Sequence, residues 1–209
     1  MDASVHIIDD DVSARRGLTR LVKALGYQAL THESAASFLA SPCRNGPGCI
    51  LLDVRMPGMT GPELQETLLG EEHALPIIFL SAHGDVPTVA NTMKRGAIHF
   101  LTKPVDRDDL ARVIEEAMVV ARKREEHHLE QEEARQKIDL LTPREHEVLT
   151  HVITGRLNKQ IAADLGVTED TVKIHRSRMM QKLGIYSAPE LLRLCDLLNI
   201  SEAESGQAG

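Results

Sequence analysis

Several kinds of segment are missing from this chain of 209 residues. No apolar run approaches the ~20 residues that a membrane-spanning helix needs. The first residues, MDASVHIIDDD, have neither the basic start nor the long apolar stretch of a secretory signal. The three cysteines are an odd number, which argues against a disulfide framework. We therefore expect a cytoplasmic protein with reduced cysteines and no membrane partner.

Aromatic residues are also scarce. They make up 2% of the chain, and tryptophan is absent, so the core must consist mainly of Leu, Ile, Val, Ala and Met. Hydrophobic residues still account for 42% and charged residues for 26%, which is ordinary for a globular protein and argues against wholesale disorder. A chain of this length can form one large domain or two small ones.

A net positive charge is missing as well. The formal net charge of −7 argues weakly against a nucleic-acid partner. The charge is unevenly distributed, however, because residues 171–182 contain four basic residues and no acid. A local basic helix can bind DNA while the whole protein stays acidic.

Residues 1–105 alternate short apolar runs with helical patterns. Near-continuous apolar runs are typical of parallel strands covered on both faces. They lie at residues 5–8, 27–31, 49–52, 77–80 and 98–101. This alternation predicts an α/β domain with a five-stranded, parallel, doubly wound sheet in the strand order 2-1-3-4-5.

The rest of the chain has a different, all-helical character. A helix is expected to begin near Asp106 and to run on through residues 122–139, which are largely charged and lack Gly and Pro; a frayed, partly disordered linker is the alternative. Capping signals at Thr142, Asn158, Thr168 and Ser187 then predict four helices, the middle two joined by a short turn as in a helix-turn-helix. The predicted divisions are a domain at 1–121, a helical linker at 122–139, an all-α domain at 140–200 and a flexible tail at 201–209.

Polar residues follow the predicted strands at their carboxyl ends. Asp9, Asp10 and Asp11 follow the first strand and Asp53 the third, while Ser81 ends the fourth strand and Lys103 follows the fifth. In an open α/β sheet these ends line one crevice. Carboxylates collected there repel one another and favour a hard cation such as Mg²⁺.

This set of residues suits phosphoryl transfer to a carboxylate. Asp53 is the expected nucleophile, the metal and Lys103 would offset charge on the phosphoryl oxygens, and Ser81 could donate a hydrogen bond to one of them. The Lys103–Pro104 bond is a candidate cis peptide that would aim the lysine. Each residue taken alone is more often an ordinary turn, cap or loop residue, so the prediction depends on the joint arrangement.

Four segments resemble the receiver domain of two-component response regulators, over about residues 3–121. They are IIDDD at 7–11, LLDVRMPGMTG at 51–61, LSAHGD at 80–85 and MKRGAIHFLTKP at 93–104. The resemblance implies a phospho-acceptor at Asp53. It implies Mg²⁺, for which Mn²⁺ can substitute, bound by Asp10, Asp53 and the backbone carbonyl of Arg55, with Asp9 acting through water. Ser81 and Phe100 match the switch pair of the family, which often has Thr and Tyr there.

Residues 141–184 resemble the LuxR-type (GerE-like) DNA-binding module. With the receiver, this resemblance indicates the NarL/FixJ class of response regulators, and AHGDVP at 82–87 resembles the FixJ branch. In a helix over 169–183, Val172, Met179 and Leu183 share the expected core face. The positions that match DNA contacts are Lys173, Ile174 and Ser177 for bases, Arg178 and Lys182 for phosphates, and Asn158 and Lys159 at the start of the preceding helix.

The resemblance implies a regulator of transcription, favours activation, and predicts no enzymatic role beyond slow self-dephosphorylation. The expected partners are a sensor histidine kinase, promoter DNA, and a second copy of the chain that pairs on phosphorylation or on DNA. The alternative is an orphan DNA-binding regulator whose receiver serves as a dimerisation module. A phosphatase is disfavoured because Arg55 stands where a second carboxylate would act as general acid.

Overall fold

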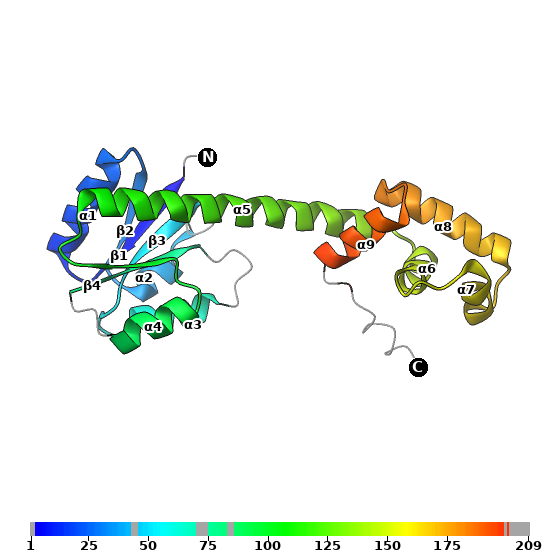
Figure 1. Cartoon of the computed structure of the whole chain (residues 1–209), viewed down its shortest axis with the longest axis horizontal. Coiled ribbons are helices and arrows are strands. Elements are labelled where there is room, and N and C mark those ends of the chain that lie inside the picture. Colours follow the sequence, from blue (N-terminus) through cyan, green and yellow to red (C-terminus); the bar gives the residue numbers. More distant parts are fainter. Residues whose placement is uncertain (1–2, 43–45, 70–74, 83–85, 199, 201–209) are drawn as a thin grey trace. The chain divides into compact units, whose positions relative to one another are not determined.

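The computed structural model describes residues 3–42, 46–69, 75–82, 86–198 and 200. The chain divides into two compact units, Met1–His128 and Leu129–Gly209 (Figure 1). The predicted tail 201–209 and residues 83–85 of the AHGDVP segment lie outside the described residues. Within the described ranges, no helix is long and apolar enough to cross a membrane.

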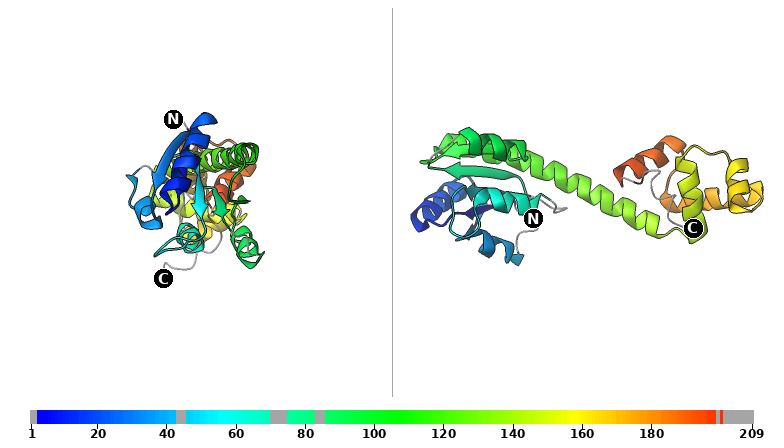
Figure 2. Two further views of the ribbon diagram at one scale, coloured as in Figure 1. Left: turned by 90° about the vertical axis from the view of Figure 1, so that its left-hand side faces the viewer. Right: turned by 90° about the horizontal axis from the view of Figure 1, so that it is seen from below.

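A five-stranded parallel sheet forms the centre of the first unit. Its strand order is β2-β1-β3-β4-β5, which confirms the predicted order. The strands are β1 (Ser4–Ile8), β2 (Gln28–His32), β3 (Gly48–Asp53), β4 (Ile77–Ser81) and β5 (His99–Thr102). The three central strands are almost entirely buried because helices cover both faces of the sheet (Figures 1 and 2).

The helices of the first unit pack on the sheet through two separate hydrophobic clusters. The helices are α1 (Val12–Ala24), α2 (Ala35–Leu39), α3 (Gly61–Leu68), α4 (Val86–Lys94) and the first part of α5 (Arg107–Asp139). On one face of the sheet, α1 and α5 pack against side chains such as Ile7 and Leu51. The other carries α2 and α3 on Ile8, Leu52 and neighbouring side chains. This arrangement leaves the carboxyl ends of the strands at one edge of the sheet.

Two histidines are buried within the second of these faces. The Nδ1 atom of His6 lies 3.1 Å from Nε2 of His32, and the two rings stack. Phe38 packs edge-on against both rings. Burial, followed by the neighbouring charge of His32, lowers the pKa of His6 to about 4, and burial also lowers the pKa of His32. The pair is therefore stable here in its neutral form.

The charged stretch after residue 121 continues as helix. The single helix α5 spans 33 residues, Arg107–Asp139, so the helical prediction is confirmed over the frayed alternative. Asp106 precedes it, and its Oδ1 accepts from the Asp108 amide at 2.8 Å. The division between the two units falls within this helix, between His128 and Leu129. The predicted linker 122–139 therefore contributes residues to both units.

Four further helices make up most of the second unit. They are α6 (Pro143–Ile153), α7 (Asn158–Leu165), α8 (Glu169–Leu183) and α9 (Ala188–Leu197). Gly166 and Gly184 end α7 and α8 with φ of 63° and 69°, the left-handed conformation that favours glycine. Thr142, Thr168 and Ser187 are N-caps as predicted.

The predicted cap of α7 is wrong by one residue. Leu157, and not Asn158, occupies the N-cap position. Leucine has no side-chain acceptor, and instead the Gln160 side chain accepts a hydrogen bond from the Leu157 amide at 2.9 Å. Asn158 therefore begins the helix, and its side chain is free to accept from another element.

Candidate functional site

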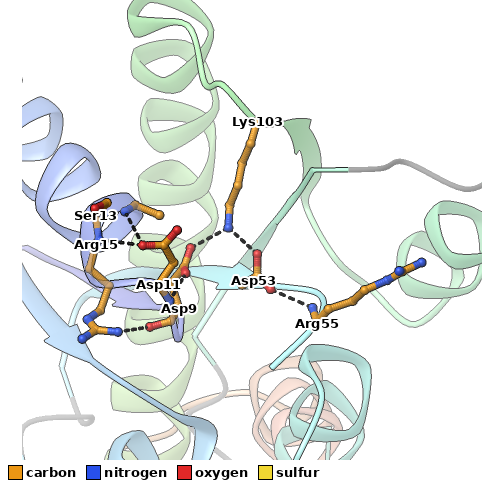
Figure 3. Close-up of polar contacts among 8 residues, drawn as sticks. Asp9, Asp11, Ser13, Arg15, Asp53, Arg55 and Lys103 are labelled. Carbon is orange, nitrogen blue, oxygen red and sulfur yellow. Dashed lines mark hydrogen bonds and ion pairs between the residues drawn. The ribbon is translucent and has the colours of Figure 1, made fainter. Parts of the chain in front are cut away.

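A lysine and two aspartates meet at the carboxyl edge of the sheet. Asp9 follows β1 directly and is 1% exposed, and Asp53 is the last residue of β3. The ammonium of Lys103, which follows β5, lies 2.6 Å from Oδ2 of Asp9 and also contacts Oδ1 of Asp53 (Figure 3). The predicted convergence of these three strand ends is therefore present in the structure. The Lys103–Pro104 peptide bond is cis.

Asp53 and Lys103 shift each other's pKa. Burial raises the pKa of Asp53, while Lys103 and the Arg55 amide, which donates to Oδ2 at 2.7 Å, offset part of that rise. Burial alone would lower the pKa of Lys103, but its hydrogen bonds to Asp53 and Asp9 raise it. Asp53 is thus a carboxylate that is poorly solvated and held by two donors, one on each oxygen.

Only part of the predicted metal site is gathered around these residues. Asp10 is exposed, and no group of three His, Cys, Asp or Glu side chains in the described ranges converges as a metal centre. Mg²⁺ commonly uses one or two carboxylates and keeps several waters, so three converged side chains are not required. The donors of Asp9 and Asp53 are oxygens, and burial disfavours the uncompensated charge of Asp53. This donor chemistry fits a hard divalent cation.

Two residues that sequence reasoning did not assign also shape the edge. The Asp11 side chain is the N-cap of α1 and accepts from the Ser13 amide at 2.7 Å. The Arg15 guanidinium donates to the backbone carbonyl of Asp9 at 2.5 Å (Figure 3). An aspartate two residues before a serine, at the start of an apolar stripe, is a capping signal that could have identified Asp11. Nothing local in the sequence indicates the Arg15 contact.

The predicted switch residues lie on the two neighbouring strands. Ser81 is buried at the end of β4, and its carbonyl accepts from the Lys103 amide at 2.8 Å. Phe100 is half-buried in β5, and its ring stacks on Phe79 of β4 with centroids 6.4 Å apart. The structure therefore links Ser81 to Lys103 through the backbone and places Phe100 two register positions before the Ser81–Thr102 pair.

A close backbone approach fixes the loop that follows Asp53. The amide of Gly61 donates to the carbonyl of Val54 at 3.1 Å. A Cβ atom at Gly61 would lie 2.3 Å from the carbonyl oxygen of Asp53 and 3.0 Å from the Phe79 ring. The position therefore requires glycine, since neither neighbour can move without displacing the strand that carries Asp53.

In the second unit, α8 presents one buried and one exposed face, as predicted. Val172, Met179 and Leu183 are buried in the core cluster. Ile174 is 52% exposed, and Lys173, Ser177 and Arg178 are also exposed. The ammonium of Lys173 lies 3.1 Å from Asp170 and 3.7 Å from Glu169, so it is already paired on its own helix.

Lys182 makes contacts that differ from the predicted phosphate contact. Its ammonium lies 2.6 Å from the carboxylate of Glu145 and donates to the carbonyl of Leu140 at 3.0 Å. Glu145 is 2% exposed and also closes the capping box of α6 through the Thr142 amide. These bonds lower the pKa of Glu145 to about 2. The geometry favours a structural role for Lys182.

At the start of α7, Asn158 and Lys159 are placed differently from each other. The Asn158 side chain accepts from the guanidinium of Arg176 on α8 at 3.1 Å. Lys159 is exposed. Asn158 thus joins α7 to α8, while Lys159 stays accessible to a ligand.

Comparisons with known proteins agree over nearly the whole chain. Residues 5–115 match the response regulator receiver domain, and residues 139–195 match the bacterial regulatory proteins of the luxR family. Nodulation protein W of Bradyrhizobium diazoefficiens is 38% identical over 98% of this chain and 90% of that protein. Transcriptional regulatory protein FixJ of Azorhizobium caulinodans is 38% identical over 96% of this chain and 95% of that protein.

A solved structure supports the same similarity. The response regulator StyR superposes with a TM-score of 0.76 at 41% sequence identity, covering 94% of this chain and 99% of that one. The likeness therefore extends over both units and is not confined to the parallel sheet.

Proposed function

Because the chain belongs to the response regulators that join a receiver domain to a LuxR-type DNA-binding domain, we propose that phosphorylation of Asp53 controls its binding to promoter DNA. The chain is a DNA-binding regulator of a two-component system and not an enzyme. The observation that carries the finer proposal is the convergence of Asp53, Asp9 and Lys103.

Asp53 is the phosphoryl acceptor in this proposal. A carboxylate oxygen of Asp53 attacks the phosphorus of a phosphohistidine on a sensor kinase, and the bond from phosphorus to the histidine nitrogen breaks. The histidine nitrogen takes the leaving electron pair. Lys103 offers its ammonium to the phosphoryl oxygens, and Ser81 offers a hydroxyl. Ionisation of Asp53 is required for the attack, and Lys103 supports it by opposing the effect of burial.

Magnesium is the cofactor that this donor set would take. We assign Asp10, Asp53 and the backbone carbonyl of Arg55 as its ligands, with Asp9 acting through water. A bound Mg²⁺ would supply positive charge that offsets the negative charge of the phosphoryl oxygens. The raised pKa of Asp53 supports this assignment, because a buried, poorly solvated carboxylate favours a nearby cation.

DNA recognition is assigned to the exposed face of α8. Lys173, Ile174 and Ser177 would meet base edges in the major groove, and Arg178 a phosphate. Lys159 and Asn158, at the start of α7, would face the adjacent backbone. The exposure of the α8 side chains supports this assignment, and the contacts of Lys182 argue for leaving it out.

Phosphorylation acts on DNA binding through pairing of two copies. The added charge at Asp53 shifts a two-state receiver through Ser81 and Phe100 toward a form that pairs. Two paired chains carry two α8 helices, and the second then binds DNA at a raised effective concentration. Activation of transcription is the expected outcome, in line with the family.

A titration of labelled promoter DNA tests the proposal. DNA upstream of the chain's own operon is the first candidate, with wild type and Asp53→Ala compared with and without a small phosphodonor and Mg²⁺. The proposal expects the donor to tighten binding by wild type alone. Equal binding under all four conditions would contradict it and would favour an orphan regulator whose receiver only dimerises.

A further inference from the structure

A buried glutamine joins α3 to α4 in the first unit. Gln65 lies on α3 and is 2% exposed. Its Nε2 atom donates to the backbone carbonyls of Thr92 at 3.0 Å and of Arg95 at 3.3 Å. Thr92 lies in the last turn of α4, and Arg95 directly follows that helix. One side-chain amide therefore holds the end of a neighbouring helix.

These hydrogen bonds complete the C-terminal cap of α4. The last carbonyls of a helix lack partners within it. Here the amide of Ala97 donates to Thr92 at 3.1 Å and that of Gly96 donates to Met93 at 3.0 Å, with Gly96 at a φ of 89°. Gln65 adds a second donor to the Thr92 carbonyl and provides one for the carbonyl of Arg95. The cap thus depends on a residue from another helix.

Packing alone does not account for an amide at this position. No described residue donates to the Oε1 atom of Gln65, which is buried. A buried acceptor without a donor is unfavourable. If the amide of Gln65 were turned over, Oε1 would face the carbonyl oxygens of Thr92 and Arg95, which cannot donate. These two carbonyls therefore fix the orientation of the amide. A methionine has a similar volume and would avoid the unpaired oxygen. What the amide provides is its two bonds to α4.

The C-terminal end of α4 has further contacts besides those of Gln65. Beside Gln65, the exposed carboxylate of Glu66 forms an ion pair with Arg95, and Thr92 is 1% exposed. At the other end, Val86 is 78% exposed. That end follows Ser81 in the chain, the residue that we assign to the switch. The anchored end of α4 is therefore the one that lies further along the chain from Ser81.

We infer that Gln65 is a positioning residue of the switch, whose amide fixes the C-terminal end of α4. A displacement that begins at Ser81 then turns the helix about this anchored end and gives one defined rearrangement of its exposed face. Without the anchor, the same displacement would move the helix without a fixed pivot. This inference rests on the proposed function, because it assigns Gln65 a part in the response to phosphorylation.

The test uses the full chain and the variant Gln65→Met. Amide hydrogen exchange over residues 92–97 is measured first, and we expect about fivefold faster exchange in the variant, the factor that loss of one ordinary hydrogen bond implies. The donor-induced tightening of promoter binding is measured next, and we expect it to fall by about fivefold for the same reason. Glu66→Gln, which removes the adjacent ion pair but keeps the Gln65 amide, is the matched control and should change neither value.

The outcomes separate this inference from the proposed function. Intact mass after treatment with donor reports phosphoryl uptake directly. If wild type takes up no phosphoryl group, the proposed function fails, and the switch role of Gln65 fails with it. If uptake is normal in both proteins but the binding response of Gln65→Met equals that of wild type, Gln65 is structural only and the inference is overturned. A reduced response without faster exchange at 92–97 would also overturn it.

Discussion

Each unit contains a lysine that joins two elements through a carboxylate, and the two pairs differ in the balance between burial and charge. In the second unit, Lys182 and the capping amide of Thr142 dominate, and the pKa of Glu145 falls to about 2. In the first, burial dominates and the pKa of Asp53 rises, although Lys103 opposes the rise. The Glu145 pair therefore stabilises the fold, whereas Asp53 is held as an anion that burial disfavours and that a nearby cation would stabilise.

After burial, the number of carboxylates around each lysine adds to this difference. Lys182 serves one carboxylate and one carbonyl, so its charge is concentrated on Glu145. Lys103 is shared between two carboxylates, and the charge of Asp9 further raises the pKa of Asp53. A shared lysine leaves excess negative charge at the sheet edge. Excess negative charge of this kind is compatible with the divalent cation that we propose for this edge.

The largest expected effect is on stability, from Lys182→Met. Removing the solvent-accessible ammonium leaves the buried Glu145 carboxylate without its cation, so the free energy of unfolding of the second unit should fall by about 1–3 kcal/mol. Amide exchange over residues 143–197 measures the loss. The double variant Glu145→Gln with Lys182→Met should recover most of it. A loss in the single variant no larger than in the double would mean that Lys182 does not stabilise the buried Glu145 carboxylate.

The next effect is a difference between the units in acid. In the first unit, the pKa of His6 is lowered to about 4, so the neutral pair contributes stability above pH 6.5 that is lost as pH falls toward 4. In the second, the lowered pKa of Glu145 contributes stability above pH 4.5 that is lost as pH falls toward 2. The first unit should therefore begin to lose stability at the higher pH.

Amide exchange as a function of pH, read separately on the two units, checks this order. His6→Gln should weaken the pH dependence of the first unit between pH 6.5 and 4 and leave that of the second unit unchanged. If both units lost stability at the same pH, and His6→Gln did not change that pH, the role assigned to His6 would be contradicted.

A smaller effect separates a DNA contact from a structural lysine. Arg178→Ala should lower the slope of log affinity against log salt by about 0.9 for each bound chain, because one phosphate contact is lost. The double variant Glu145→Gln with Lys182→Met should leave the slope unchanged, because the ammonium of Lys182 is held by Glu145. A lowered slope in the double variant would instead support the phosphate contact that the sequence predicts for Lys182.

The smallest effect is on the thermal stability of the first unit. Asp53→Asn removes a carboxylate whose ionised form is disfavoured by burial, so Tm at neutral pH should rise modestly. The rise should shrink as pH falls, because the raised pKa of Asp53 means that wild type loses this penalty on protonation. Calorimetry at several pH values measures it. A lower Tm for Asp53→Asn at neutral pH would mean that Lys103 outweighs burial.

Much of this architecture could be predicted from the sequence. The strand order and the buried face of α8 follow from apolar patterns, and most helix ends follow from capping residues such as Thr142 and Gly184. The convergence of Asp9, Asp53 and Lys103 followed from the rule that strands of an open sheet end at one edge. These features depend on local periods or on topology, which the sequence carries directly.

The features that sequence reasoning missed depend on contacts between distant residues. Glu145 and Lys182 are 37 positions apart, and each alone is an ordinary charged residue. Gln65 and Thr92 meet only once α3 and α4 are packed. The predicted start of α7 is one residue too late because the N-cap, Leu157, has no side-chain acceptor. The Gln160 side chain caps this end instead, by accepting from the Leu157 amide. Such pairings are set by tertiary packing, and no local pattern encodes them.

The most direct test of the account is phosphoryl uptake by the intact chain. Wild type, Asp53→Asn and Lys103→Met would be treated with a small phosphodonor, with and without Mg²⁺, and analysed by intact mass and peptide mapping. We expect one phosphoryl group per wild-type chain, located on Asp53 and dependent on Mg²⁺, none on Asp53→Asn, and slower uptake by Lys103→Met. Uptake by Asp53→Asn equal to that of wild type, or none by wild type, would contradict the assignment of Asp53 as the reactive carboxylate.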